Sequence, residues 1–293
     1  MERFYLLAPA LLLLAVFVIG LVIFVALSAS GHDPVVKGAK HNQFFGAFWG
    51  RYLVWMMTPL ERLLVGRVSA NTITALSLLL CALTGVAAAT GHLTGAVWMF
   101  AFAGILDALD GRLARLNGEQ TTAGALFDSV SDRWGELFAF SGYIWFLRDT
   151  SWMLAAVGAI GASQMVSYTR ARAEGLGLNL HGGVMQRAER VVLTAAGTLV
   201  AAWYHAVPAT AHLVAPILGT TLLVCAIGST GTAVNRWIVA YRELVKRAAS
   251  EKRGEPATAT AEPAARPPTT MPGFPVPQKL RESAELAPAV PRI

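Results

Sequence analysis

Four aspartates lie within some of the most apolar sequence of this chain, and they constrain its fold more than any other feature. They are Asp107, Asp110, Asp128 and Asp132. A charged side chain at the centre of a bilayer costs roughly 2.5–3.5 kcal/mol on insertion scales, so an ionisable residue in an apolar span is expected to be functional and to have a partner. The chain must therefore bring these carboxylates together with groups that neutralise them.

The spacing of the aspartates predicts two helical faces that converge. Asp107 and Asp110 are three residues apart at the end of one apolar run, and Asp128 and Asp132 are four apart at the start of the next, so each pair shares a helical face. If the two helices are antiparallel neighbours joined by the polar turn 117–122, both faces can converge on one point. Carboxylate oxygens suit Mg²⁺ and Mn²⁺, which commonly bridge phosphate oxygens. The pattern therefore predicts metal-assisted chemistry on a phosphate near the membrane surface.

The residues between the two pairs suit a phosphate ligand. Gly111 and Gly124 remove side chains where a ligand could approach, and Ala114 keeps the next turn shallow. Arg115 supplies a planar cationic fork that matches a diphosphate.

The complete motif is Asp107-x2-Asp110-Gly111-x2-Ala114-Arg115-x8-Gly124-x3-Asp128-x3-Asp132. It resembles the signature of the CDP-alcohol phosphatidyltransferase family at every fixed position. The resemblance implies a six-helix membrane domain from about Asn71 to Trp237, and transfer of a phosphatidyl group from CDP-diacylglycerol to an alcohol hydroxyl with release of CMP. It also implies that the first three aspartates hold Mg²⁺ or Mn²⁺ and that Asp132 is the general base, with a metal-ligand role for Asp132 left open.

The same resemblance suggests residues near the cytidine nucleotide. Family members often carry Pro-Asn-x-x-Thr before the first helix of the domain, and this chain retains Asn71 and Thr74 but has Ala70 in place of the proline. The expected CDP-binding set is Asn71, Thr74, Gly111, Ala114, Arg115 and Gly124. Helix capping by Ser69 or Asn71 explains that stretch equally well.

The composition places the chain among polytopic membrane proteins of all-α class. Apolar residues make up 55% of the sequence and charged residues 14%, with a mean hydropathy of +0.50. We expect a six-helix transmembrane bundle plus one extra N-terminal transmembrane helix at 5–28, a stretch for which a signal peptide is the alternative. The six spans are predicted near 71–90, 93–113, 121–147, 152–173, 189–208 and 211–235.

Basic residues follow the second, fourth and sixth of these spans, whereas the alternate loops carry few. By the positive-inside rule the aspartates lie at the cytoplasmic face, in a cell membrane that we expect to be a bacterial inner membrane. The net charge of +6 fits this membrane-surface bias and gives no sign of nucleic-acid binding.

Four segments are expected along the chain. Residues 1–30 form the N-terminal transmembrane helix, and 31–70 form a juxtamembrane, interfacial segment for which an ordinary soluble connector is the alternative. Residues 71–247 form the transferase domain, and 248–293 form a disordered cytoplasmic tail rich in proline, alanine and threonine. Cys81 and Cys225 lie in apolar runs and are expected to be buried thiols rather than a disulfide.

A second group of residues concerns the acceptor. The run Ser167–Gly175 contains Arg170 and Arg172, and Arg187 and Arg190 follow after a glycine-rich loop. These arginines resemble those of the family branch that attaches inositol phosphate, where they would bind the acceptor's phosphate. The alternative is that they are positive-inside anchors paired with Glu174 and Glu189.

Other interpretations remain at this stage. The same reaction with glycerol 3-phosphate or another alcohol is the main alternative, and a cation transporter that binds its ion through intramembrane carboxylates is a remote one. The small residues of 158–163 suit either homodimerisation in lipid or close packing within one bundle. Besides membrane lipid, the expected partners are CDP-diacylglycerol and a small alcohol acceptor.

Overall fold

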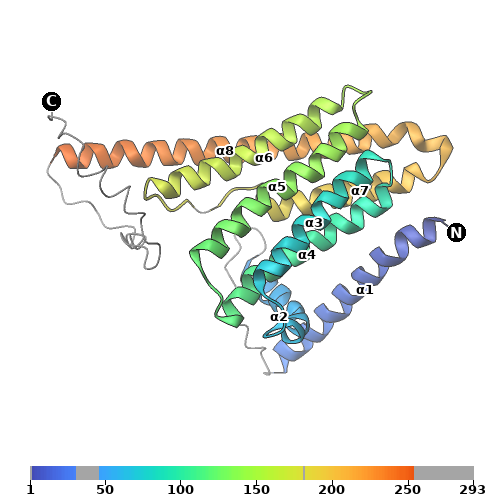
Figure 1. The fold of residues 1–293 in the computed structure, drawn as a ribbon, viewed down its shortest axis with the longest axis horizontal. Helices are drawn as coiled ribbons and strands as arrows, with labels where there is room; N and C mark the ends of the chain where they lie inside the picture. Colours follow the sequence, from blue (N-terminus) through green and yellow to red (C-terminus); the bar gives the residue numbers. More distant parts are fainter. Residues whose placement is uncertain (1, 31–45, 181, 254–293) are drawn as a thin grey trace, which may run out of the picture.

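The computed structural model describes residues 2–30, 46–180 and 182–253, and it is helical throughout these ranges apart from turns and short connectors (Figure 1). The expected all-α class is therefore confirmed. The helices are α1 (Glu2–Ala29), α2 (Gly46–Leu64), α3 (Ala70–Ala89), α4 (Leu93–Asn117), α5 (Thr122–Phe146), α6 (Met153–Gly175), α7 (Arg187–His205) and α8 (Val214–Lys252), with a short 3₁₀ helix, Pro208–Leu213, before α8.

Within the described ranges, three stretches are long and apolar enough to cross a membrane, which indicates a membrane protein. They are α3, α4 and the segment Pro208–Ser250, while α1 contributes a shorter apolar helical stretch, Val18–Ala29. The span expected at 121–147 is a helix, but α5 carries Asp128, Asp132, Arg133 and Glu136. The count of seven crossings stays a prediction.

Helix α3 is the central element next to the site. It packs extensively against both α4 and α5, whereas α4 and α5 make no extended contact with each other within the described ranges. The condition that α4 and α5 are direct neighbours is therefore not met. Two glycines explain why α3 and α5 come so close: a Cβ on Gly142 would lie 2.1 Å from the carbonyl oxygen of Gly85, and one on Gly85 would lie 2.3 Å from that of Phe138.

The rest of the bundle is built around α8. Helix α6 packs along α8, and α7 packs against both α4 and α8. A buried apolar cluster that includes Phe140, Leu147 and Leu222 fills the space between these helices. Within the same region, the hydroxyl groups of Tyr143 and Thr198 are 2.8 Å apart and hydrogen-bonded. Gly158 of α6 faces Ala226 of α8, so packing within one bundle accounts for this part of the 158–163 stretch.

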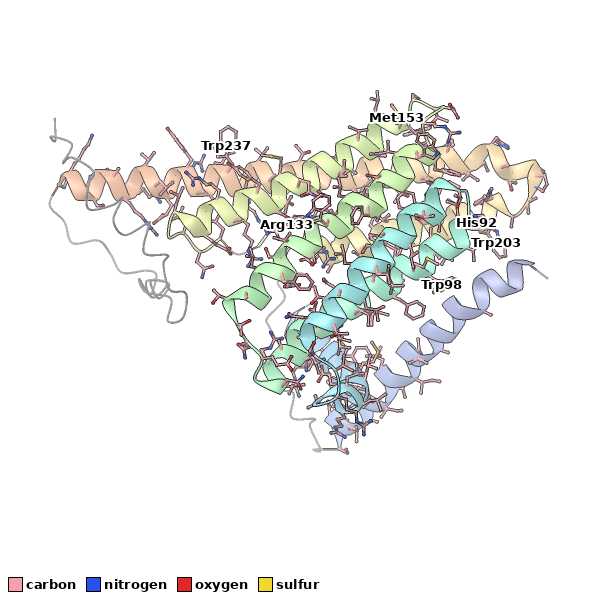
Figure 2. All side chains as sticks on the ribbon, viewed as in Figure 1. His92, Trp98, Arg133, Met153, Trp203 and Trp237 are labelled. Carbon is pink, nitrogen blue, oxygen red and sulfur yellow. The ribbon has the colours of Figure 1, made fainter. Side chains whose placement is uncertain are left out.

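One cavity lies at the far end of the bundle from the α4–α5 turn. Its volume is ≈ 650 Å³, and its lining includes His92, at the start of α4, and His205, at the end of α7. Figure 2 labels His92 and Trp203 at this end. The cavity is therefore remote from the aspartates, which lie toward the other ends of these helices.

The helix boundaries follow local sequence signals. Helix α4 ends where Gly118 adopts a left-handed conformation (φ 68°), and α5 begins after Thr121, whose hydroxyl accepts a hydrogen bond from the amide of Gly124 at 2.9 Å. At the start of α3, Ser69 is the capping residue and accepts from the amide of Thr72 at 3.2 Å. Asn71 lies inside the helix, which decides between the two expected caps.

Several expectations concern the ends of the chain. Helix α2 occupies part of the expected juxtamembrane segment, and 31–45 lie outside the described residues. Helix α8 continues past residue 247 to Lys252, and residues 254–293 of the expected tail also lie outside the description. Cys81 and Cys225 are buried free thiols, as predicted. Helix α1 packs against α2 through Phe24 and Tyr52, and it also contacts α7.

Candidate active site

Three of the four predicted aspartates converge at one end of the bundle. Asp107 and Asp110 come from the last turns of α4, Asp128 comes from the second turn of α5, and one carboxylate oxygen of each lies within 4.8 Å of the others. Asp110 is buried, and the other two are partly exposed. Three hard oxygen ligands around a common centre, two of them on partly exposed side chains, are a donor set that fits Mg²⁺ or Mn²⁺.

The carboxylate of Asp110 is held from two directions. The hydroxyl of Thr74 donates to Oδ2 at 2.7 Å, and the backbone amide of Gly111 lies 2.5 Å from Oδ1. Thr74 was expected near the nucleotide, but in the structure its buried side chain contacts a carboxylate of the cluster. Its role in this geometry is to orient Asp110, a function that the Asn-x-x-Thr spacing alone does not reveal.

Arg187 is the cationic member of the site. Its guanidinium at the start of α7 forms ion pairs with both Asp107 and Asp132. Sequence reasoning placed Arg187 at the acceptor and did not anticipate that it would pair with the aspartates. A Cβ on Gly135 would lie 3.1 Å from the sulfur of Cys81 but at an ordinary contact distance, 3.8 Å, from the guanidinium, so this glycine allows α5 to approach Cys81 of α3. Asp132 therefore faces Arg187, one turn beyond Asp128.

The other predicted acceptor arginines occupy different environments. Arg190 is buried, with Nε 2.9 Å from Oε1 of Glu136 and Nη1 3.2 Å from the carbonyl oxygen of Met185.

Arg170 is exposed and pairs with Glu174 at 2.8 Å, as the anchor alternative predicts. Arg172 is exposed. Instead of joining a salt bridge to these arginines, Glu189 accepts the amide of Gln186 at 3.1 Å and caps α7.

An arginine that sequence reasoning did not single out also points inward here. Arg236 of α8 is buried and donates to the carbonyl oxygens of Gly182, at 3.1 and 2.8 Å, and of Val166, at 2.9 Å. Arg170 and Arg190 are close enough to interact with it electrostatically. Arg236 follows an apolar run and resembles an ordinary positive-inside residue, so the sequence carries no signal for its burial.

The remaining candidate residues lie around the α4–α5 turn. A Cβ on Gly124 would lie 3.5 Å from the side-chain oxygen of Asn71, so these two predicted nucleotide-binding positions are adjacent. Among the described residues, chain neighbours and the local helix backbone apart, only the Arg115 guanidinium would lie within 4 Å of a Cβ on Gly111, at 3.8 Å. Asn71 and Arg115 are exposed, and Ala114 is partly buried.

Comparison with known proteins agrees with this geometry. The model of the CDP-alcohol phosphatidyltransferase family matches residues 67–229, more than half of the chain. A phosphatidylinositol phosphate synthase of Mycobacteroides abscessus is 38% identical over 117 residues, which cover 38% of this chain and 52% of that protein. The chain thus spans about half the length of the curated relatives that it matches.

Solved structures of the phosphatidylinositol phosphate synthase of Mycobacterium tuberculosis have the same fold. The form with bound CDP-DAG superposes with a TM-score of 0.54 and 28% identity, covering 63% of this chain and 93% of that one. The complex with manganese and citrate gives a TM-score of 0.55 and 27% identity, covering 63% and 88%. The motif, the convergent aspartates and the family match together show that this chain belongs to the CDP-alcohol phosphatidyltransferase family.

Proposed function

We propose that this protein transfers the phosphatidyl group of CDP-diacylglycerol to a hydroxyl group of inositol phosphate and releases CMP. The observation that carries the proposal is the convergence of Asp107, Asp110 and Asp128 within 4.8 Å at one end of an apolar helical bundle. Such a site can hold a lipid whose tails stay in the bilayer while its diphosphate reaches the carboxylates. The names of its relatives and structural neighbours support inositol phosphate as the acceptor.

The proposed cofactor is Mg²⁺ or Mn²⁺, held by Asp107, Asp110 and Asp128. When bound, the ion would neutralise charge on the diphosphate and make its phosphorus more susceptible to attack. The neighbouring structure with manganese supports this choice of ion. The protein's own contribution is to orient the ligands, which Thr74 does for Asp110.

In the proposed reaction a hydroxyl oxygen of the acceptor forms a bond to the phosphatidyl phosphorus, and the bond from that phosphorus to the bridging oxygen of the diphosphate breaks. CMP leaves with the bridging oxygen. Asp132 accepts the hydroxyl proton, because it lies beside the carboxylate cluster while remaining outside the group of three that converges. A supporting metal contact from Asp132 is compatible with the same role, and Arg187 offsets its charge.

The substrates are assigned to two sides of this centre. Asn71, Gly111, Ala114, Arg115 and Gly124 surround the α4–α5 turn and are proposed to bind the CDP group, with Thr74 acting through Asp110. The proposed acceptor residues are Arg170, Arg172, Arg187 and Arg190, which lie on α6 and α7. A phosphorylated acceptor needs cationic partners beside a diphosphate and several carboxylates. We place this site at the cytoplasmic face of the bacterial inner membrane.

The proposal can be tested by following CMP release from purified protein in detergent. Release should require both a divalent metal and an acceptor, and inositol phosphate should support it far better than inositol. CMP release that is unaffected by removing the metal with EDTA would contradict the assignment of the aspartates. Equal rates with and without an acceptor would indicate hydrolysis of CDP-diacylglycerol instead of transfer.

A further inference from the structure

A buried ion pair connects α2 to the helix that carries two of the clustered aspartates. Glu61 of α2 is 4% exposed, and its carboxylate contacts the guanidinium of Arg112 through both oxygens, with Nη2 of Arg112 3.1 Å from Oε2. The side chain of Arg112 is 13% exposed. Burying two long charged side chains in this way is unfavourable unless the pair is well matched, and a two-point contact between guanidinium and carboxylate meets that condition.

The pair lies on the opposite side of α4 from the site. With 3.6 residues per turn, Arg112 points about 200° around the helix from Asp110 and about 140° from Asp107. Asp110 faces α3, where it accepts from Thr74, and Arg112 faces α2. Helix α4 is therefore held by polar contacts on two opposing faces just where its metal-binding residues lie.

Further contacts continue the connection from α2 to the end of α4. The side-chain oxygen of Asn117 accepts the amide of Gly66 at 3.0 Å, and its amide group donates to the carbonyl oxygen of Val68 at 3.2 Å. One oxygen of Glu119 accepts the amide of Ala70, the first residue of α3, at 3.0 Å. These bonds fasten the α2–α3 connector to the α4–α5 turn. Among the contacts between these two regions, the pair between Glu61 and Arg112 is the one that joins two charged groups, with Glu61 buried and Arg112 partly buried.

We propose that Glu61 is a positioning residue for the metal site: through Arg112 it fixes the rotation of α4 about its axis, and hence the positions of the Asp107 and Asp110 carboxylates. Side-chain tips lie about 5–6 Å from a helix axis, so a rotation of about 10° displaces a carboxylate by about 1 Å. Functional groups must be held to within about 0.5 Å. Glu61 precedes the residues that match the family model, 67–229, so this contact adds an element outside the family's core to the site.

The inference rests on the proposed function, because it assumes that the carboxylate cluster binds metal. It is tested by titrating the full chain in detergent with Mn²⁺, with CDP-diacylglycerol present, and measuring free Mn²⁺ by electron paramagnetic resonance. Glu61→Gln should weaken Mn²⁺ binding by about tenfold or more, the range typical of residues that orient metal ligands. The matched control is Glu243→Gln, which removes a half-exposed ion pair to Arg247 on α8 and should leave Mn²⁺ affinity unchanged.

Two double variants separate positioning from folding. Glu61→Gln with Arg112→Gln leaves no unpaired buried charge, so it should fold and still bind Mn²⁺ about tenfold more weakly. Glu61→Arg with Arg112→Glu restores an ion pair. It should recover Mn²⁺ affinity to within about threefold of the parent, a smaller loss than the tenfold expected for Glu61→Gln. A folded neutral pair with parental Mn²⁺ affinity would overturn the inference, as would a folded swapped pair that binds as weakly as Glu61→Gln. If the parent protein binds no Mn²⁺, the proposed metal site itself fails, which is a distinguishable result.

Discussion

The carboxylates of Asp107, Asp110 and Asp128 would repel one another without a counter-charge, and Arg187 supplies part of it through Asp107. Asp128→Asn keeps the size of the side chain but removes an anionic ligand. We expect this variant to lower the transfer rate by more than roughly 10–100-fold, the loss typical of residues that only orient metal ligands. The protein should remain folded, because the change also relieves repulsion. Turnover is measured as CMP release, and near-parental turnover would exclude Asp128 as a ligand.

The acceptor arginines should separate into two classes. Arg190→Ala leaves Glu136 buried without its partner, so it should lower the free energy of unfolding by about 3–5 kcal/mol. Arg170→Ala removes an exposed side chain and should leave the free energy of unfolding nearly unchanged. It should raise the Michaelis constant for inositol phosphate roughly ten- to a hundredfold, because the loss of one charged hydrogen bond costs about 1.5–3 kcal/mol. Thermal unfolding and acceptor titration of both variants test this division. A parental Michaelis constant in Arg170→Ala would make Arg170 a surface anchor.

At the scale of single residues, the sequence predicted that the aspartates of each pair share a helical face, because three- and four-residue spacings place side chains on one face however the helices pack. It did not predict that Thr74 orients Asp110, that Arg187 pairs with Asp132, or that Glu136 lies buried against Arg190. Each of these contacts joins residues on two different helices, and at least 36 positions separate the partners in sequence. Their geometry depends on how the helices are rotated and packed, which periodicity within one helix does not specify.

Helix α3, between α4 and α5, decides how the two aspartate pairs meet. The crossing of α3 and α5 depends on Gly85 and Gly142, where the backbones of the two helices contact each other directly because neither residue has a side chain. Gly142→Ala should lower the free energy of unfolding by about 1–3 kcal/mol or more, because a carbonyl oxygen lies 2.1 Å from the new Cβ and cannot easily move. Gly161→Ala is the control, since within the described ranges nothing beyond its own helix backbone lies within 4 Å of its Cβ position. Equal thermal stability of the two variants would show that the crossing is looser than described.

The sequence predicted the element boundaries well but not the element order in space. Apolar run length and capping residues such as Ser69 and Thr121 place α3 to α7 within a few residues. The short turn after Asn117 is compatible with direct packing of α4 on α5, but that condition is not met because α3 occupies the position between them. The distinction depends on small residues 57 positions apart in sequence, Gly85 and Gly142, whose contact no local pattern reveals.

At the scale of the whole molecule, every residue assigned to the candidate site lies before the end of α8 at Lys252. Residues 254–293 are rich in proline, alanine and threonine and lack the apolar pattern of a core. Deleting them should leave CMP release within about twofold of the parent, since segments whose sequence lacks a core-forming pattern commonly tolerate truncation. The comparison requires equal membrane insertion of both proteins. A large loss of turnover in a properly inserted truncation would show that the tail contributes to catalysis.

The central claim is that this chain joins a phosphatidyl group to inositol phosphate. The most direct test gives the purified protein CDP-diacylglycerol, Mn²⁺ and an equimolar mixture of inositol phosphate, inositol and glycerol 3-phosphate, and resolves the product lipids by mass. We predict that phosphatidylinositol phosphate forms as the main product, in amounts equal to the CMP released and only with metal present. A product built mainly on inositol or glycerol 3-phosphate would contradict the acceptor assignment, and the absence of any new phospholipid would contradict the transferase itself.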